Sequence, residues 1–160
     1  MKFSRIWAPL GLAAAALLAG PFGSPMSASA QQAPDYIYIG IGGGDNGFVL
    51  NGKVTLYDNV SLRPEVATDF NFNDNDDVSY VVPITYDFNS VGTGNAAFNP
   101  FIGAGVAGDI GTNSDIDFAL VAGADYRFAD RYVANGSVNY TPFANNNDEV
   151  GFTLGLGYLF

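Results

Sequence analysis

Apolar and polar side chains alternate along most of the chain after residue 31. A period of two residues is typical of β-strands, because successive side chains point to opposite faces of a sheet. Clusters of Asn, Asp and Gly, which favour turns, separate the alternating segments. The pattern predicts an all-β protein with eight antiparallel strands, at Asp35–Gly42, Gly47–Tyr57, Val60–Phe72, Val78–Phe88, Phe98–Ile110, Ile116–Phe128, Arg131–Phe143 and Glu149–Phe160.

The predicted connections are short, and this favours an up-and-down order of strands. Asp58-Asn59 and Ala129-Asp130 have the composition of tight turns. An even number of strands joined in this way closes into a barrel that leaves both termini on one side. Longer loops are predicted at 73–77, 89–97, 111–115 and 144–148.

The two faces of these strands differ in chemistry. One face carries only apolar and aromatic residues, and its aromatic residues gather at the strand ends: Phe118 and Phe128 flank Leu120, and Tyr80 and Phe88 flank Ile84. Two aromatic girdles around an aliphatic band suit a lipid bilayer, where aromatic rings favour the headgroup level. We therefore predict a transmembrane β-barrel; a soluble lipocalin-like binder, with the apolar face inside, is the less favoured alternative.

The first thirty residues have the features of a secretory signal peptide. Lys2 and Arg5 precede an apolar stretch from Leu10 to Ala19, and the small residues Ala28-Ser29-Ala30 form a cleavage site. The apolar stretch is too short for a membrane-spanning helix, which needs about 20 residues. We predict a cleaved signal peptide at 1–30 and a single barrel domain at 31–160.

The polar face supplies charged residues that would point into the lumen of the barrel. Charges in a narrow lumen must pair or be hydrated. We therefore predict an ion-pair network that plugs the half of the lumen nearest the termini, with a selective pore as the alternative. The residues of this network are Lys53, Arg63, Glu65, Asp87, Asp125, Arg127 and Arg131.

Composition excludes several classes of function. Without the signal peptide, four basic residues stand against sixteen acidic ones, which leaves a net charge of −12 and makes nucleic acid an unsuitable partner. The chain contains no histidine and no cysteine, which removes Ser-His and Cys nucleophile chemistry. We expect no cofactor and no enzymatic activity.

Two further patterns have simpler explanations than a binding site. Gly103–Gly108 matches the dinucleotide-binding pattern G-x-G-x-x-G, but a turn follows it where that fold requires a helix. Asn73–Asp77, with Asp45, Asp115, Asp117, Asp148 and Glu149, forms an acidic rim. A solvated rim is the simpler explanation, and weak binding of divalent cations is the alternative.

Three segments carry a resemblance to a known family. These are Asn99–Gly108, Val121–Phe128 and the closing Gly155–Phe160, all rich in glycine and aromatic residues. With them the chain resembles the OmpA/OmpX-like superfamily of small outer-membrane β-barrels, in particular the outer membrane protein beta-barrel domain group. The resemblance implies residence in the outer membrane, with outer-membrane lipid and lipopolysaccharide as surroundings. The final aromatic residue looks like the signal read by the barrel assembly machinery.

From these observations we expect a small integral outer-membrane protein with both termini in the periplasm. Its expected role is structural, or lies in interactions at the cell surface, with a lumen plugged by charged side chains. A porin-like passive channel for small solutes is the alternative.

Overall fold

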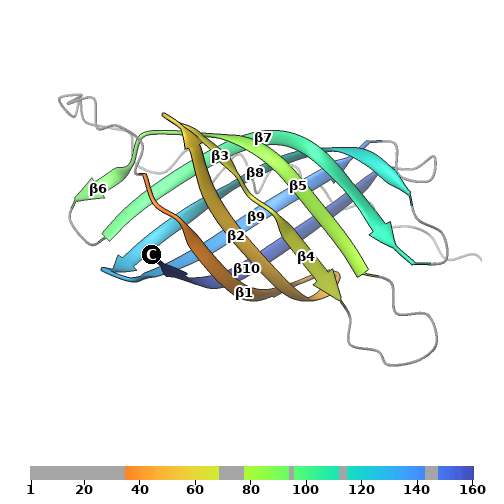
Figure 1. Cartoon of the computed structure of the whole chain (residues 1–160), viewed down its shortest axis with the longest axis horizontal. Coiled ribbons are helices and arrows are strands. Elements are labelled where there is room, and N and C mark those ends of the chain that lie inside the picture. Colours follow the sequence, from red (N-terminus) through yellow and green to blue (C-terminus); the bar gives the residue numbers. More distant parts are fainter. Residues whose placement is uncertain (1–34, 69–77, 94–95, 112–114, 143–147) are drawn as a thin grey trace, which may run out of the picture.

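The computed structural model describes residues 35–68, 78–93, 96–111, 115–142 and 148–160. These residues form one antiparallel sheet that closes into a barrel (Figure 1). Within these ranges, no helix is both long and apolar enough to cross a membrane. The strands are β1 (Tyr38–Gly44), β2 (Gly47–Tyr57), β3 (Val60–Leu62), β4 (Glu65–Thr68), β5 (Val78–Asp87), β6 (Val91–Thr93), β7 (Ala96–Ile110), β8 (Ile116–Ala129), β9 (Tyr132–Thr141) and β10 (Glu149–Leu159).

The first and last strands close the barrel. β1 pairs with β10 without a shift of register, from Tyr38 opposite Leu159 to Gly44 opposite Thr153. The seam needs glycine, because a Cβ atom on Gly42 would lie 2.1 Å from the backbone oxygen of Leu154. The prediction of a closed eight-stranded antiparallel barrel is confirmed, with β3 and β4 together forming the third strand of the wall.

The third strand differs from the prediction. A continuous strand was expected from Val60 to Phe72, but Arg63 and Pro64 interrupt it between β3 and β4. Pro64 has no N–H to donate to a neighbouring strand, although its carbonyl still accepts a hydrogen bond from the Gly52 amide at 3.0 Å. Positions 69–72 lie outside the described residues.

The predicted loop at 89–97 was also wrong in part. Val91–Thr93 forms β6, which pairs with Ala96–Phe98 of β7 as a short hairpin. Gly92 takes a φ of 119°, a conformation that L side chains rarely adopt. Strand ends otherwise differ by a few residues, as where β1 starts at Tyr38 instead of Asp35.

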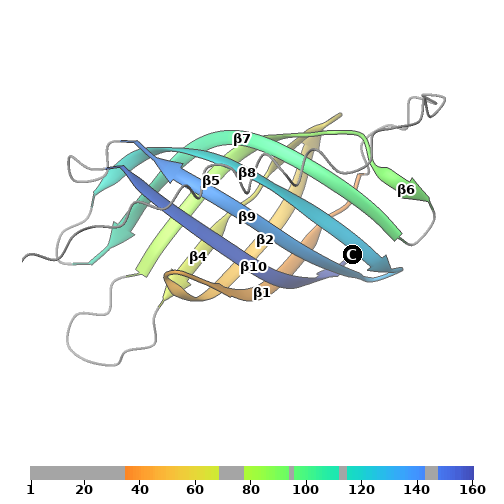
Figure 2. The same cartoon turned by 180° about the vertical axis from the view of Figure 1, so that it is seen from behind.

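The two ends of the described chain lie at the same end of the barrel. The Phe160 amide donates a hydrogen bond to the Ile37 carbonyl at 3.0 Å. Figures 1 and 2 show that β6 extends beyond the barrel at this end. We call it the terminal end, and the opposite end, where β1 turns into β2, the loop end.

Candidate functional site: the barrel lumen and the apolar belt

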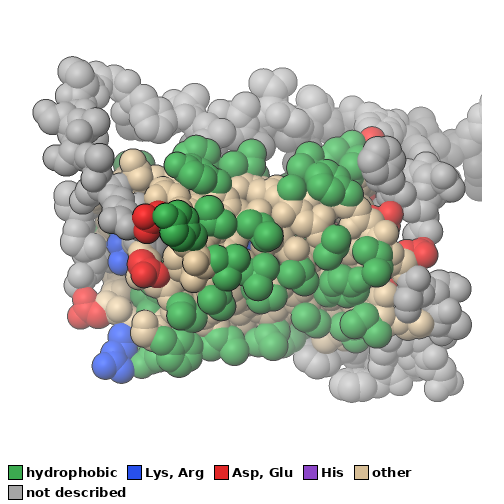
Figure 3. Space-filling view, turned by 45° about the horizontal axis from the view of Figure 1, so that its top comes forward, with side chains coloured by type: hydrophobic (Ala, Val, Ile, Leu, Met, Phe, Trp, Pro, Cys, Tyr) green, Lys and Arg blue, Asp and Glu red, His purple; other side chains and the backbone are tan. Residues whose placement is uncertain are grey.

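Large apolar side chains cover the outside of the wall. Ile84 is 55% exposed in the middle of β5, and Leu156 is 59% exposed on β10. Figure 3 shows hydrophobic side chains over the length of the visible wall and charged side chains toward its two ends. We call this surface the apolar belt; its aliphatic members include Ile39, Ile41, Leu50, Val54, Val66, Ile84, Ile102, Val106, Leu120, Val138, Leu154 and Leu156.

Aromatic rings border the belt at the terminal end. Adjacent ring centroids lie 5.5 to 6.4 Å apart along one continuous row. The row runs through Tyr126, Phe128, Tyr132, Tyr158 and Phe160. Toward the loop end, Phe48, Phe118 and Phe152 are also exposed. The predicted girdles are therefore present in the described residues.

Inside the barrel, Arg63 links opposite sides of the wall. This side chain is 7% exposed, and its Nη1 and Nη2 atoms donate to the two carboxylate oxygens of Asp125 on β8 at 3.1 and 2.8 Å. Nη2 also donates to Oδ1 of Asp87 at 3.1 Å, and the guanidinium stacks on the Phe101 ring at 3.6 Å. A two-point contact between arginine and carboxylate fixes orientation as well as distance.

Asp87, the last residue of β5, is the second anion of the lumen. Its Oδ2 atom lies 2.8 Å from the Lys53 ammonium nitrogen and accepts a hydrogen bond from the Ser61 hydroxyl at 2.5 Å. The Thr85 hydroxyl donates to Oδ1 at 3.3 Å. Lys53 is fully buried, and its ammonium also lies 3.7 Å from the centroid of the Tyr36 ring.

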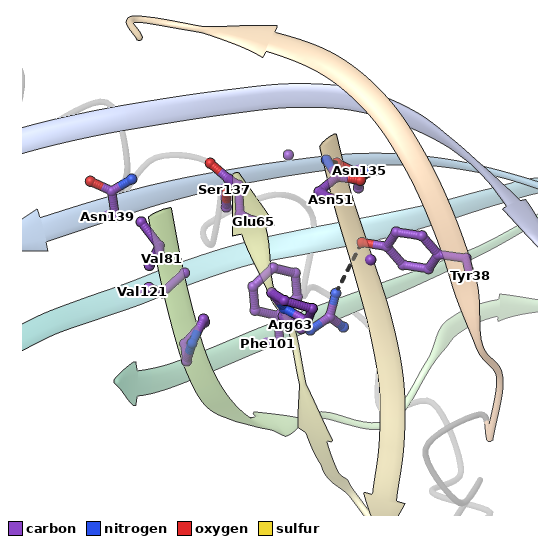
Figure 4. Close-up of a pocket in the computed structure, with 14 residues that line it drawn as sticks. Tyr38, Asn51, Arg63, Glu65, Val81, Phe101, Val121, Asn135, Ser137 and Asn139 are labelled. Atoms are coloured by element: carbon purple, nitrogen blue, oxygen red, sulfur yellow. Dashed lines mark hydrogen bonds between the residues drawn. The ribbon is translucent and has the colours of Figure 1, made fainter. Parts of the chain in front are cut away.

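Two tyrosines cover the cluster from the side of the first strand. The Tyr36 hydroxyl donates to Oδ2 of Asp125, and the Tyr38 hydroxyl donates to Oδ1 at 3.4 Å. Tyr38 also accepts a hydrogen bond from Arg63 at 3.5 Å (Figure 4). A Cβ atom at position 157 would lie only 2.7 Å from Cδ2 of the Tyr38 ring. Gly157 therefore leaves the space that this ring occupies.

We call Lys53, Arg63, Asp87 and Asp125 the lumen cluster. It contains two cations and two anions, and each cation lies within 2.8 Å of an anion. Buried charges are tolerated when they are paired and hydrogen-bonded, and removal of one partner leaves an uncompensated charge. The cluster joins β2, β5, β8 and the Arg63–Pro64 interruption of the third strand, and so connects different parts of the wall across the lumen.

Two small cavities lie on the loop side of the cluster. One has a volume of about 30 Å³ and is lined by Tyr38, Arg63, Glu65 and Asn135, among others (Figure 4). The other has about 20 Å³ and also touches Glu65. Each is large enough to hold water, because one water molecule needs about 10–15 Å³ of such space.

The remaining predicted site residues take other positions. Glu65 accepts a hydrogen bond from the Thr153 hydroxyl at 2.5 Å, outside the lumen cluster. The guanidinium of Arg127 lies 5.5 Å from the Tyr36 ring centroid, and its Nε is buried with no hydrogen-bond partner in the described part of the chain.

The prediction that Arg131 faces the lumen was wrong. β9 begins only at Tyr132, so Arg131 belongs to the turn after β8, where alternation no longer determines which way a side chain points. The residue is exposed, and its Nη1 donates to the Tyr158 hydroxyl on the outside of the barrel at 2.7 Å.

Several residues of the site were not identified from the sequence. The sequence pattern did not place Tyr36, Tyr38, Ser61 or Phe101 next to a charge. Phe101 follows Pro100 and precedes the outward-facing Ile102, so strict alternation would have placed it inside. Its contact with Arg63 depends on the distance between β7 and the third strand, which no local pattern contains.

The acidic rim is described only in part. Within the described residues, no group of three or more Asp, Glu, His or Cys side chains is placed to hold a metal ion. The predicted segment Asn73–Asp77 lies outside these residues. Binding of divalent cations therefore stays a prediction.

A closed antiparallel wall, an apolar exterior bordered by aromatic rings and an interior with buried ion pairs define a small β-barrel of the outer-membrane type. Among solved structures, the chain is similar to the N-terminal β-barrel domain of Pseudomonas aeruginosa OprF, with a TM-score of 0.61 and 20% identity over 81% of this chain and 100% of that one. It is also similar to a de novo designed transmembrane β-barrel, with a TM-score of 0.53 and 18% identity over 81% and 99% of the two chains.

A third similar structure is the Yersinia pestis outer membrane protein Ail in a phospholipid nanodisc, with a TM-score of 0.49 and 18% identity over 79% of this chain and 100% of that one. No family model matches the sequence. No curated protein matches it either. At these identities, the similarity to the first two structures establishes the fold alone.

The charge balance of the lumen cluster leads to a stability prediction. Asp125→Asn leaves two cations facing one carboxylate, and we expect it to lower the free energy of unfolding by about 3 kcal/mol, as for other broken buried ion pairs. Arg63→Met with Asp125→Asn restores neutrality, and this double variant should recover more than half of the loss. Urea unfolding in detergent, followed by circular dichroism, measures both.

The exposed Arg131→Gln serves as the control and should change stability by less than about 0.5 kcal/mol. Equal losses in the single and double variants would show that charge balance does not stabilise the lumen.

Proposed function

We propose that this protein is an integral protein of the cell outer membrane with a structural or surface-interaction role and a closed lumen. The apolar belt is the observation that carries this proposal. Isoleucines and leucines more than 50% exposed, such as Ile84, Ile102 and Leu156, cover the wall. In water such a continuous apolar surface favours aggregation, whereas a bilayer removes it from water.

The lumen cluster supports the proposal that the lumen is closed to solutes. An eight-stranded barrel has an interior just wide enough for side chains to fill. The four charges, two tyrosines and Phe101 occupy the half nearest the termini, and the cavities beyond them have volumes of about 30 and 20 Å³.

We also propose an orientation and partners. Short turns of outer-membrane barrels face the periplasm, and β2 and the third strand, like β8 and β9, are joined by short turns at the terminal end. The terminal end would then be periplasmic, and the acidic connections of the loop end would face lipopolysaccharide, with divalent cations between the negative charges. Phe160, at 80% exposure, is available to the barrel assembly machinery. No catalytic role is proposed.

Substitution by arginine at two depths tests membrane insertion. Ile84 lies midway along β5, and an arginine there should cost about 2–4 kcal/mol in a bilayer. Ile116 is 73% exposed at the first residue of β8, near the interface, where the same substitution should cost at most about 1 kcal/mol. Folding into phosphatidylcholine vesicles, followed by protection of the wall from protease, measures the difference.

In a water-soluble protein an arginine at either exposed position would be tolerated. Equal folding of Ile84→Arg, Ile116→Arg and wild type, in the absence of lipid or detergent, would therefore contradict the proposal.

A porin-like channel is the second candidate, and the cavities on both sides of Glu65 are the observation that favours it. Conductance of the purified protein in a planar lipid bilayer separates the two candidates. We expect no stable current steps from the wild type, because the lumen cluster crosses the lumen. Stable steps of reproducible size would support the channel instead.

A further inference from the structure

Arg131 is an unusual cation for its position. Of the four basic residues in the described ranges, Lys53 and Arg63 are buried, Arg127 faces the lumen, and only Arg131 is exposed. It lies in the turn at the terminal end, directly beyond the aromatic row that borders the apolar belt. A lone arginine is therefore placed where the wall leaves the hydrocarbon region of the membrane.

Arg131 and Tyr158 present converging hydrogen-bond donors. The Tyr158 hydroxyl accepts a hydrogen bond from Nη1 of Arg131 at 2.7 Å, so the proton of the hydroxyl is free to point to another acceptor. A guanidinium carries five N–H donors, and this hydrogen bond uses one of them. The pair therefore presents the remaining N–H groups of the guanidinium and the phenolic O–H side by side on the outside of the barrel.

Aromatic rings flank the pair. The Tyr158 ring meets Tyr132 edge to face at 5.8 Å and Phe160 edge to face at 5.5 Å. Tyr132 also stacks on Phe128 at 6.3 Å. The rings hold Tyr158 in place and form an apolar surface next to the donors, suited to acyl chains that continue from a bound headgroup.

We propose that Arg131 and Tyr158 bind the phosphate of an anionic phospholipid headgroup in the leaflet at the terminal end. Phosphate oxygens are the acceptors that an arginine fork suits best. The adjacent apolar rings favour a lipid over a free anion, and a periplasmic terminal end favours a phospholipid over lipopolysaccharide. The inference rests on the proposed membrane insertion and adds a lipid partner to it.

Native mass spectrometry of the intact barrel, released from detergent micelles with added phosphatidylglycerol, tests the site. We expect wild type to retain the lipid, and Arg131→Gln to lower the affinity about fivefold, the contribution of one basic residue at an anionic surface. Tyr158→Phe should lower it about twofold, because it removes one neutral hydrogen bond.

Two variants serve as controls. Arg127→Gln removes the same charge near the end of β8, but inside the lumen, and should leave lipid affinity unchanged. Asp130→Asn removes the neighbouring negative charge and should raise it.

The outcomes separate this proposal from the proposed function. If wild type inserts into phosphatidylcholine vesicles but binds phosphatidylglycerol no better than Arg131→Gln does, the lipid site is wrong and the membrane assignment stands. A wild type that fails to insert overturns both. Displacement of the lipid by millimolar inorganic phosphate, or stronger binding of lipopolysaccharide, would overturn the choice of a phospholipid.

Discussion

Pairing of β1 with β10 is the constraint on which the rest of the structure depends. A sheet surrounded by lipid has no water for the backbone groups of an unpaired edge, and closure gives those groups partners. The seam brings the two backbones so close that Gly42 cannot carry a side chain without a shift. Closure with eight strands also fixes a narrow interior, which side chains must fill.

The lumen cluster follows from that narrow interior. Polar side chains must point inward because the outer surface is apolar, and there they lose most of their contact with water. Arg63 compensates for this loss by contacting the carboxylates of Asp87 and Asp125, which lie on different strands. Lys53 contacts Asp87 as well. The same contacts that compensate buried charge therefore also connect opposite sides of the wall.

Much of the fold was predictable from the sequence because alternation is a local property. The inward side of Lys53, Asp87 and Asp125 and the outward side of Ile84 follow directly from a period of two. The break at Arg63 and Pro64 was less accessible, although a proline in a wall strand is a signal for it.

The details of the site depend on distances across the barrel, which local patterns do not contain. Arg63 and Asp125 are 62 positions apart in the sequence, and alternation does not show which of the inward-facing carboxylates Arg63 contacts. The error at Arg131 has a different cause. The alternation was extended to Arg131, one residue outside β9. In the turn, alternation no longer determines the direction of the side chain.

Electrophoresis of the membrane fraction, with and without boiling, tests the closed membrane barrel most directly. A closed barrel resists SDS at room temperature, because its backbone hydrogen bonds are satisfied within the wall. The account predicts that the unheated protein is found in the membrane fraction and migrates differently from the boiled protein. Identical mobility before and after boiling, or release of the protein from cells by osmotic shock without detergent, would contradict it.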